Sequence, residues 1–108
     1  MTPGVAAVIR SHFEGSAYVG LVLPDGWFGR PYDNMSTLEG VILDGEELCI
    51  SFDGDMRILL TGDVDTSLDG AALKISGFSK LLWSWRPCGS SDRREQTYTS
   101  GTLRMIHL

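Results

Sequence analysis

The sequence predicts a mainly β protein, in which an antiparallel meander of six or seven short strands forms a small barrel or a sandwich. Three observations predict this class. The Asp-Gly pairs at 44–45 and 53–54 separate apolar runs as tight hairpins do. Further short runs, rich in β-branched and aromatic residues, recur between turn-forming segments. The length of 108 residues fits one domain, residues 1–108, with one modest core.

The N-terminal segment is expected to form a short helix. Thr2 can cap it, with Pro3 at its first position. Val5, Ile9 and Phe13 recur near helical spacing and would share one face.

The strands follow from short apolar or alternating runs bounded by Gly, Pro, Asp and Ser. They are expected at 18–23, 36–42, 46–51, 55–61, 71–76, 81–85 and 98–108. Residues 77–79 indicate a bend or bulge, and Gly101 is a possible interruption of the last strand. Residues 63–69 are interpreted as a turn with solvated carboxylates, and residues 87–96 as a polar connection.

The register of the first hairpin follows from the need for one apolar face. A two-residue loop at 44–45 would place Leu48 opposite Val41 and put Glu39 among apolar residues. A three-residue loop at 43–45 avoids this and is the prediction. It gathers on one face Leu38, Ile42, Leu48 and Ile50.

The second hairpin is treated in the same way, with a loop at 52–54. This loop sets Met56 opposite Ile50 and Ile58 opposite Leu48, and Leu60 follows on the same side. Both turns therefore predict one continuous buried face.

The net charge of −5 is unevenly distributed along the chain. Residues 25–69 carry −9 and residues 70–108 carry +4. An acidic surface repels phosphates, so neither nucleic acid nor an anionic membrane is an expected partner. The division fits acidic strands paired with basic ones in one sheet, or self-association between unlike patches.

Residues 1–12 carry no basic leader, and Arg10 interrupts their apolar run. Nowhere does the sequence approach the run of about 20 apolar residues that a membrane-spanning helix needs. We expect a soluble, cytoplasmic chain in which Cys49 and Cys88 are free thiols.

The segment 25–34 is the first candidate site, because it is richer in recognition residues than a turn requires. Aromatic and guanidinium side chains dominate recognition surfaces through stacking, cation–π contact and bidentate pairing. The candidates are Trp27, Phe28, Arg30, Tyr32 and Asp33. In the alternative interpretation the aromatic residues fold inward as a lid on the barrel.

Trp83 and Trp85 are the second candidate site. Two residues apart on a strand, they should point to the same side. They would form the floor of an apolar ligand pocket, or they would supply core area as buried aromatics commonly do.

The sequence gives little support for a catalytic site or a metal site. His12 and His107 are the two bases available to Cys88, and they lie at opposite ends of the chain. The acidic run from Asp63 to Asp69 lacks the Gly and Glu of a calcium loop. We therefore expect no metal, no cofactor and no catalytic residue.

The sequence thus predicts a non-catalytic binding or interaction module that uses residues 25–34 to bind a protein partner or a second copy of itself. The alternative is a small-molecule-binding barrel that uses Trp83 and Trp85 together with Tyr32 and Arg30. An enzyme of unrecognised type is the third hypothesis, and it would require a close acid–base pair in a cleft.

Overall fold

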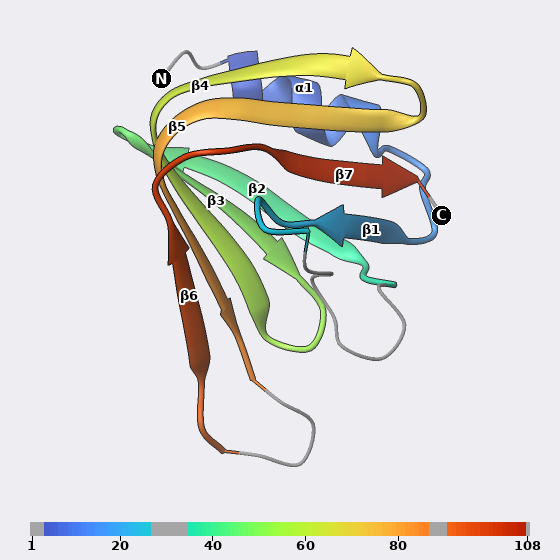
Figure 1. The fold of residues 1–108 in the computed structure, drawn as a ribbon. Helices are drawn as coiled ribbons and strands as arrows, with labels where there is room; N and C mark the ends of the chain where they lie inside the picture. Colours follow the sequence, from blue (N-terminus) through green and yellow to red (C-terminus); the bar gives the residue numbers. More distant parts are fainter. Residues whose placement is uncertain (1–3, 27–34, 87–90, 108) are drawn as a thin grey trace.

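The computed structural model describes residues 4–26, 35–86 and 91–107, which form one helix and seven strands (Figure 1). The elements are α1 (Gly4–His12), β1 (Val19–Val22), β2 (Leu38–Asp44), β3 (Glu47–Phe52), β4 (Met56–Asp69), β5 (Ala72–Trp85), β6 (Arg94–Tyr98) and β7 (Leu103–His107). The predicted mainly β class, with one short N-terminal helix, is confirmed. That helix is too short to span a membrane, and the described residues contain no other.

The strands form one antiparallel sheet that curls into a half-barrel (Figure 1). Their order is β1-β7-β5-β4-β3-β2, and β6 pairs with β5 beside β7. Ser36, just before β2, exchanges two backbone hydrogen bonds with Val19 of β1. The first and last strands of the order therefore meet at this bridge.

β4 and β5 are long and bend at the same place. Their register shifts on either side of Gly62, which has a φ of 108° and lies opposite Phe78. Gly77 has a φ of 79°, and its Cα lies against the backbone carbonyl of Asp63. Because of the bend, the first half of β5 pairs with β7 and its second half pairs with β6.

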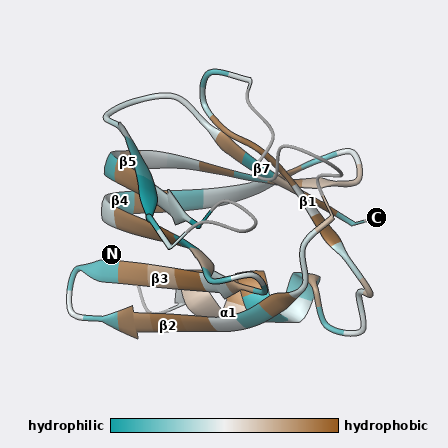
Figure 2. Ribbon diagram, turned by 90° about the horizontal axis from the view of Figure 1, so that it is seen from below, coloured by the Kyte–Doolittle hydropathy of each residue, from teal (hydrophilic) through white to brown (hydrophobic). Residues whose placement is uncertain are grey.

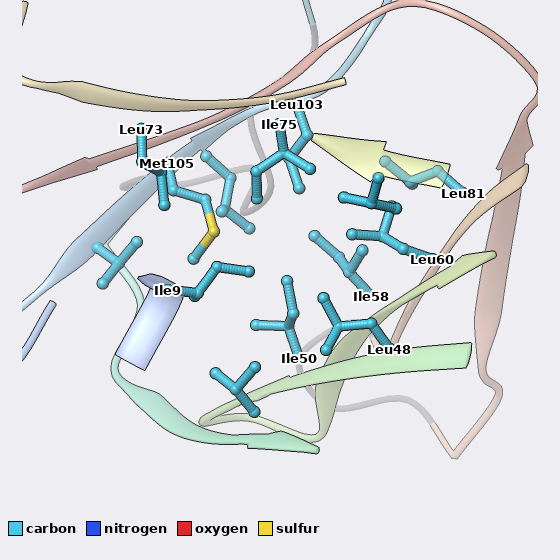
Figure 3. Packing of buried hydrophobic residues seen from close by; sticks show 14 of the residues in the cluster. Ile9, Leu48, Ile50, Ile58, Leu60, Leu73, Ile75, Leu81, Leu103 and Met105 are labelled. Atoms are coloured by element: carbon cyan, nitrogen blue, oxygen red, sulfur yellow. The ribbon is translucent and has the colours of Figure 1, made fainter. Parts of the chain in front are cut away.

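The inner face of the half-barrel holds the core, where side chains from six strands and the helix converge (Figure 3). Leu48, Ile50 and Ile58 are fully buried, as the sequence predicts. α1 lies against β2 and β4 and adds Ile9 and neighbouring apolar residues to the same cluster.

The predicted register of the first hairpin is wrong. Leu43 pairs with Leu48 and Asp44 with Glu47, so the loop is the two residues 45–46. This register turns β2 over: Ile42 is 63% exposed, whereas Val41 is buried. Residues 41–43 are all apolar, so alternation alone did not distinguish the two faces.

The second hairpin keeps the predicted face but shifts its pairs. Phe52 pairs with Met56 and Ile58 with Ile50, so the loop is residues 53–55. A shift of two positions leaves every side chain on its own face of the sheet. The predicted inner residues of β3 and β4 are therefore buried.

Three other expectations are corrected. Residues 63–69, interpreted as a turn, continue β4 and pair with β5 up to Asp69. β6 occupies part of the polar connection predicted at 87–96, and the last strand begins at Leu103, later than expected. β6 lacks the apolar alternation on which the sequence argument depends. Residues 63–69 do alternate, with Val64 and Leu68 between polar residues, but their aspartates favoured a turn.

We expect the bend at Gly77 to be essential for stability. A methyl group in Gly77→Ala would overlap the carbonyl oxygen of Asp63, in addition to the cost of a positive φ. Gly70→Ala is the matched control, because Gly70 also has a positive φ but has open space around its Cα. In urea unfolding, Gly70→Ala should lose about 1–2 kcal/mol, and Gly77→Ala about 1 kcal/mol or more beyond that. Equal losses would contradict the predicted overlap.

Candidate functional site

Trp83 and Trp85 stack on each other at the end of β5. Their ring centroids are 4.1 Å apart and their planes differ by 3°. Both project from the inner face of the strand, as their spacing predicts. They continue the apolar core toward the end of the half-barrel.

The two indoles differ in burial, but each has a buried N–H donor without an acceptor. Trp83 is 1% exposed and belongs to the core, while Trp85 is half-buried against it. In both rings the Nε1 atom is buried and has no hydrogen-bond partner. A buried donor without an acceptor costs about 1–3 kcal/mol, so buried indoles usually have one. Two adjacent orphan donors are therefore an uncompensated cost at this site.

β6 carries the inner face beyond the core. Trp83 pairs with Gln96, and Trp85 pairs with Arg94. Directly paired residues of antiparallel strands project to the same face, so these polar side chains stand beside the indoles. Arg94 and Gln96 are exposed. We call the inner face formed by Trp83, Trp85, Arg94, Gln96 and Tyr98 the β5–β6 shelf.

Tyr98 closes one end of the shelf. It pairs with the buried Leu81, and its hydroxyl donates a hydrogen bond of 3.1 Å to Oδ2 of Asp25. Burial, together with the hydrogen bond and charge of Asp25, raises the pKa of Tyr98 to about 12. The phenol therefore stays protonated at neutral pH and ties the segment after β1 to β6.

The outer side of the same strands is held by charged groups. Arg93 donates to Oγ of Ser84 at 2.7 Å and to the carbonyl of Asp55 at 3.1 Å. The Asp55 carboxylate also pairs with Arg93 at 2.6 Å and with Arg86 at 3.0 Å. The hydrogen bond from Arg93 and the surrounding guanidinium charges lower the pKa of Asp55. These contacts hold the β5–β6 hairpin against the β3–β4 turn, so they position the shelf.

The remaining predicted site residues lie outside the described part of the chain. They are Trp27, Phe28, Arg30, Tyr32 and Asp33. Cys88 also lies outside it, whereas Cys49 is a free thiol as predicted. The recognition role of the 25–34 segment therefore stays a prediction.

The fold brings the two histidines together, although they are far apart in sequence. The rings of His12 and His107 are 4.7 Å apart, and Phe13 contacts both rings. Ser16 Oγ is hydrogen-bonded to Nδ1 of His107. Burial and the charge of His107 lower the pKa of His12, whose Nε2 is buried without a partner.

This cluster is a weak catalytic candidate. Ser16 lines a cleft of about 640 Å³ between α1 and β2, so a serine and a base do meet beside a cleft. A catalytic base is normally oriented by a third group through a hydrogen bond. The rings of His12 and Phe13 both pack against His107 at tilted angles, and such ring contacts do not orient an imidazole by a hydrogen bond. The contacts of the cluster therefore join the end of α1 to β7, and they do not have the arrangement of a catalytic triad.

Metal ligands do not gather anywhere in residues 4–26, 35–86 and 91–107. No group of three or more His, Cys, Asp or Glu side chains that could hold a metal ion occurs there. The carboxylates of Asp63, Asp65 and Asp69 are spread along β4.

The Tyr98 hydroxyl should titrate apart from exposed tyrosine, near pH 12 instead of near pH 10. Because its pKa is raised in the folded state, its contribution to stability is complete below pH 10 and is lost as the pH rises through about 12. Asp25→Asn removes the carboxylate charge and should lower the pKa of Tyr98, measured by phenolate absorbance. Asp44→Asn is the control, and equal titration curves for both variants would contradict the contact.

Acid should weaken the attachment of α1. The pKa of His12 is lowered, so its contribution to stability is present above the ordinary histidine value near 6.5 and is lost as the pH falls through the lower folded value. His107→Gln removes the second charge, so the pKa of His12 should rise. Titration of the imidazole signals by NMR measures this change. A His12 pKa that does not move in the variant would show that the rings are not in contact.

Comparisons of the chain with protein-family models, with curated proteins and with solved structures found no match. The function proposed below is therefore inferred from the described side chains and their contacts. Among these, the β5–β6 shelf combines an apolar floor, polar groups and unsatisfied donors.

Proposed function

We propose that this chain is a non-catalytic binding module that holds a small, flat ligand on the β5–β6 shelf. The observation that carries the proposal is the stacked pair Trp83 and Trp85, which lies beside the exposed Arg94 and Gln96. Ligand sites in proteins are mostly apolar, with a few polar groups that fix orientation. The shelf has this composition.

The residue types on the shelf suggest the chemistry of the ligand. An aromatic or conjugated ring would pack beside the indoles. A carboxylate on that ring would pair with the guanidinium of Arg94, which is exposed beside Trp85. Gln96 offers both a donor and an acceptor to a polar substituent. We therefore propose an aromatic carboxylate or a similar planar acid.

The protein-partner hypothesis for residues 25–34 is kept as the second proposal. The hydrogen bond from Tyr98 to Asp25 supports it, because it ties the start of this segment to the edge of the shelf. This proposal assigns partner binding to Trp27, Arg30 and Tyr32, which lie outside the described residues.

A panel of benzoate, 2-naphthoate and indole-3-acetate tests the proposal. At least one member should quench tryptophan fluorescence and raise the melting temperature, because it binds the folded state. Arg94→Ala and Gln96→Ala should each weaken binding about tenfold, or about 1.4 kcal/mol. Thr97→Ala is the matched control, because Thr97 is the next residue on β6 and pairs on the outer face.

Two outcomes would overturn the small-ligand proposal. One is a panel of which no member binds. The other is binding that Arg94→Ala and Gln96→Ala leave unchanged relative to Thr97→Ala. In either case, loss of partner capture in Arg30→Ala would still support the role of the 25–34 segment.

A further inference from the structure

Four Asp-Gly pairs occur in the chain, at 25–26, 44–45, 53–54 and 69–70, and each lies at a turn. An Asp-Gly pair can cyclise, because the backbone nitrogen of the glycine can attack the carboxyl carbon of the aspartate side chain. Glycine favours this reaction, since it has no side chain to hinder the attack and its backbone rotates freely. The four pairs are alike in sequence, so the fold decides which aspartate can react.

Contacts with other segments hold the carboxylates of Asp53 and Asp69. Oδ1 of Asp53 accepts a hydrogen bond of 2.7 Å from the backbone nitrogen of Thr37, and the backbone nitrogen of Asp53 donates to the carbonyl of Thr37 at 3.0 Å. Oδ2 of Asp69 pairs with Arg104 at 2.9 Å. Cyclisation requires the carboxyl group to turn toward the next peptide nitrogen, so each of these contacts opposes it.

Both reacting groups of the pair at 25–26 are held. Oδ2 of Asp25 accepts the hydrogen bond from Tyr98. The backbone nitrogen of Gly26 donates to the carbonyl of Leu23 at 2.8 Å, so the atom that would have to attack is also engaged.

Asp44 has no such contact. Its side chain is exposed at the end of β2, and no described residue offers its carboxylate a hydrogen bond or an ion pair. Gly45 has a φ of 62° and open space around its Cα, and its nitrogen makes none of the described turn hydrogen bonds. The turn of the β2–β3 hairpin lies at the edge of the molecule and is hydrophilic (Figure 2). Both reacting groups are therefore open to solvent and to each other.

We propose that Asp44 is a modification site, at which the chain isomerises spontaneously to isoaspartate. In the first step the backbone nitrogen of Gly45 attacks Cγ of the neutral Asp44 carboxyl group. A C–N bond forms, the bond from Cγ to the hydroxyl oxygen breaks, and the hydroxyl leaves with the amide proton as water. In the second step a water molecule opens the resulting succinimide ring at the backbone carbonyl carbon of Asp44. The bond from Cγ to the nitrogen remains, so the main chain then runs through Cβ and Cγ.

The product would alter the end of the hairpin. Its main chain contains one additional carbon atom at position 44, and the former backbone carbonyl becomes a free carboxylate. Asp44 pairs with Glu47 directly beside the loop 45–46. The longer main chain should break this pair and loosen the end of β2, because a two-residue loop fixes the register of the strands it joins.

Incubation of the folded chain in mildly acidic buffer tests the proposal. Electron-transfer fragmentation of the digested protein distinguishes isoaspartate from aspartate at each position. Asp44 should isomerise about threefold to tenfold faster than Asp25, Asp53 or Asp69, the factor that an exposed hydrogen bond or ion pair supplies. In urea the four rates should become similar, because the contacts that distinguish them are lost. A folded chain in which Asp44 is not the fastest site, or a ratio that persists unchanged in urea, would overturn the proposal.

Two variants separate the effect of the contacts from that of the sequence. Asp44→Glu retains the charge but would have to close a six-membered ring, so isomerisation at this position should fall below detection. Arg104→Ala frees the carboxylate of Asp69, whose isomerisation should rise about threefold while that of Asp44 stays unchanged. An Asp69 rate that does not change would show that the ion pair gives no protection, and it would contradict the selection of Asp44 by the fold.

Discussion

The rest of the architecture depends on one constraint: β4 and β5 must bend at the same point. A flat strand has two neighbours along its whole length, but β5 has three, because β7 and β6 each take half of its edge. Gly62 and Gly77 permit the two backbones to approach at the bend, where a side chain would collide. The sheet can therefore curl around one core while β6 extends the inner face past it.

That extension explains why the shelf differs from the core beside it. Across the sheet, the inner face passes from Ile58 through Trp83 to Gln96. Ile58 and Trp83 are covered by other strands, whereas Gln96 is exposed. The edge of the core is thus also the place where stacked indoles meet polar groups. If the core were enclosed on all sides, the indoles would have no edge at which to meet polar side chains.

Local patterns predicted the fold class and the buried faces of β3 and β4, since Asp-Gly turns and alternation are short-range signals. They failed where that signal was absent. Residues 41–43 are uniformly apolar, so the face of β2 was ambiguous, and β6 has no apolar stripe. In the candidate site, the spacing of Trp83 and Trp85 was enough to predict that they share a face. The contacts of Tyr98 with Asp25 and of His12 with His107 depend on long-range pairing, which no local pattern encodes.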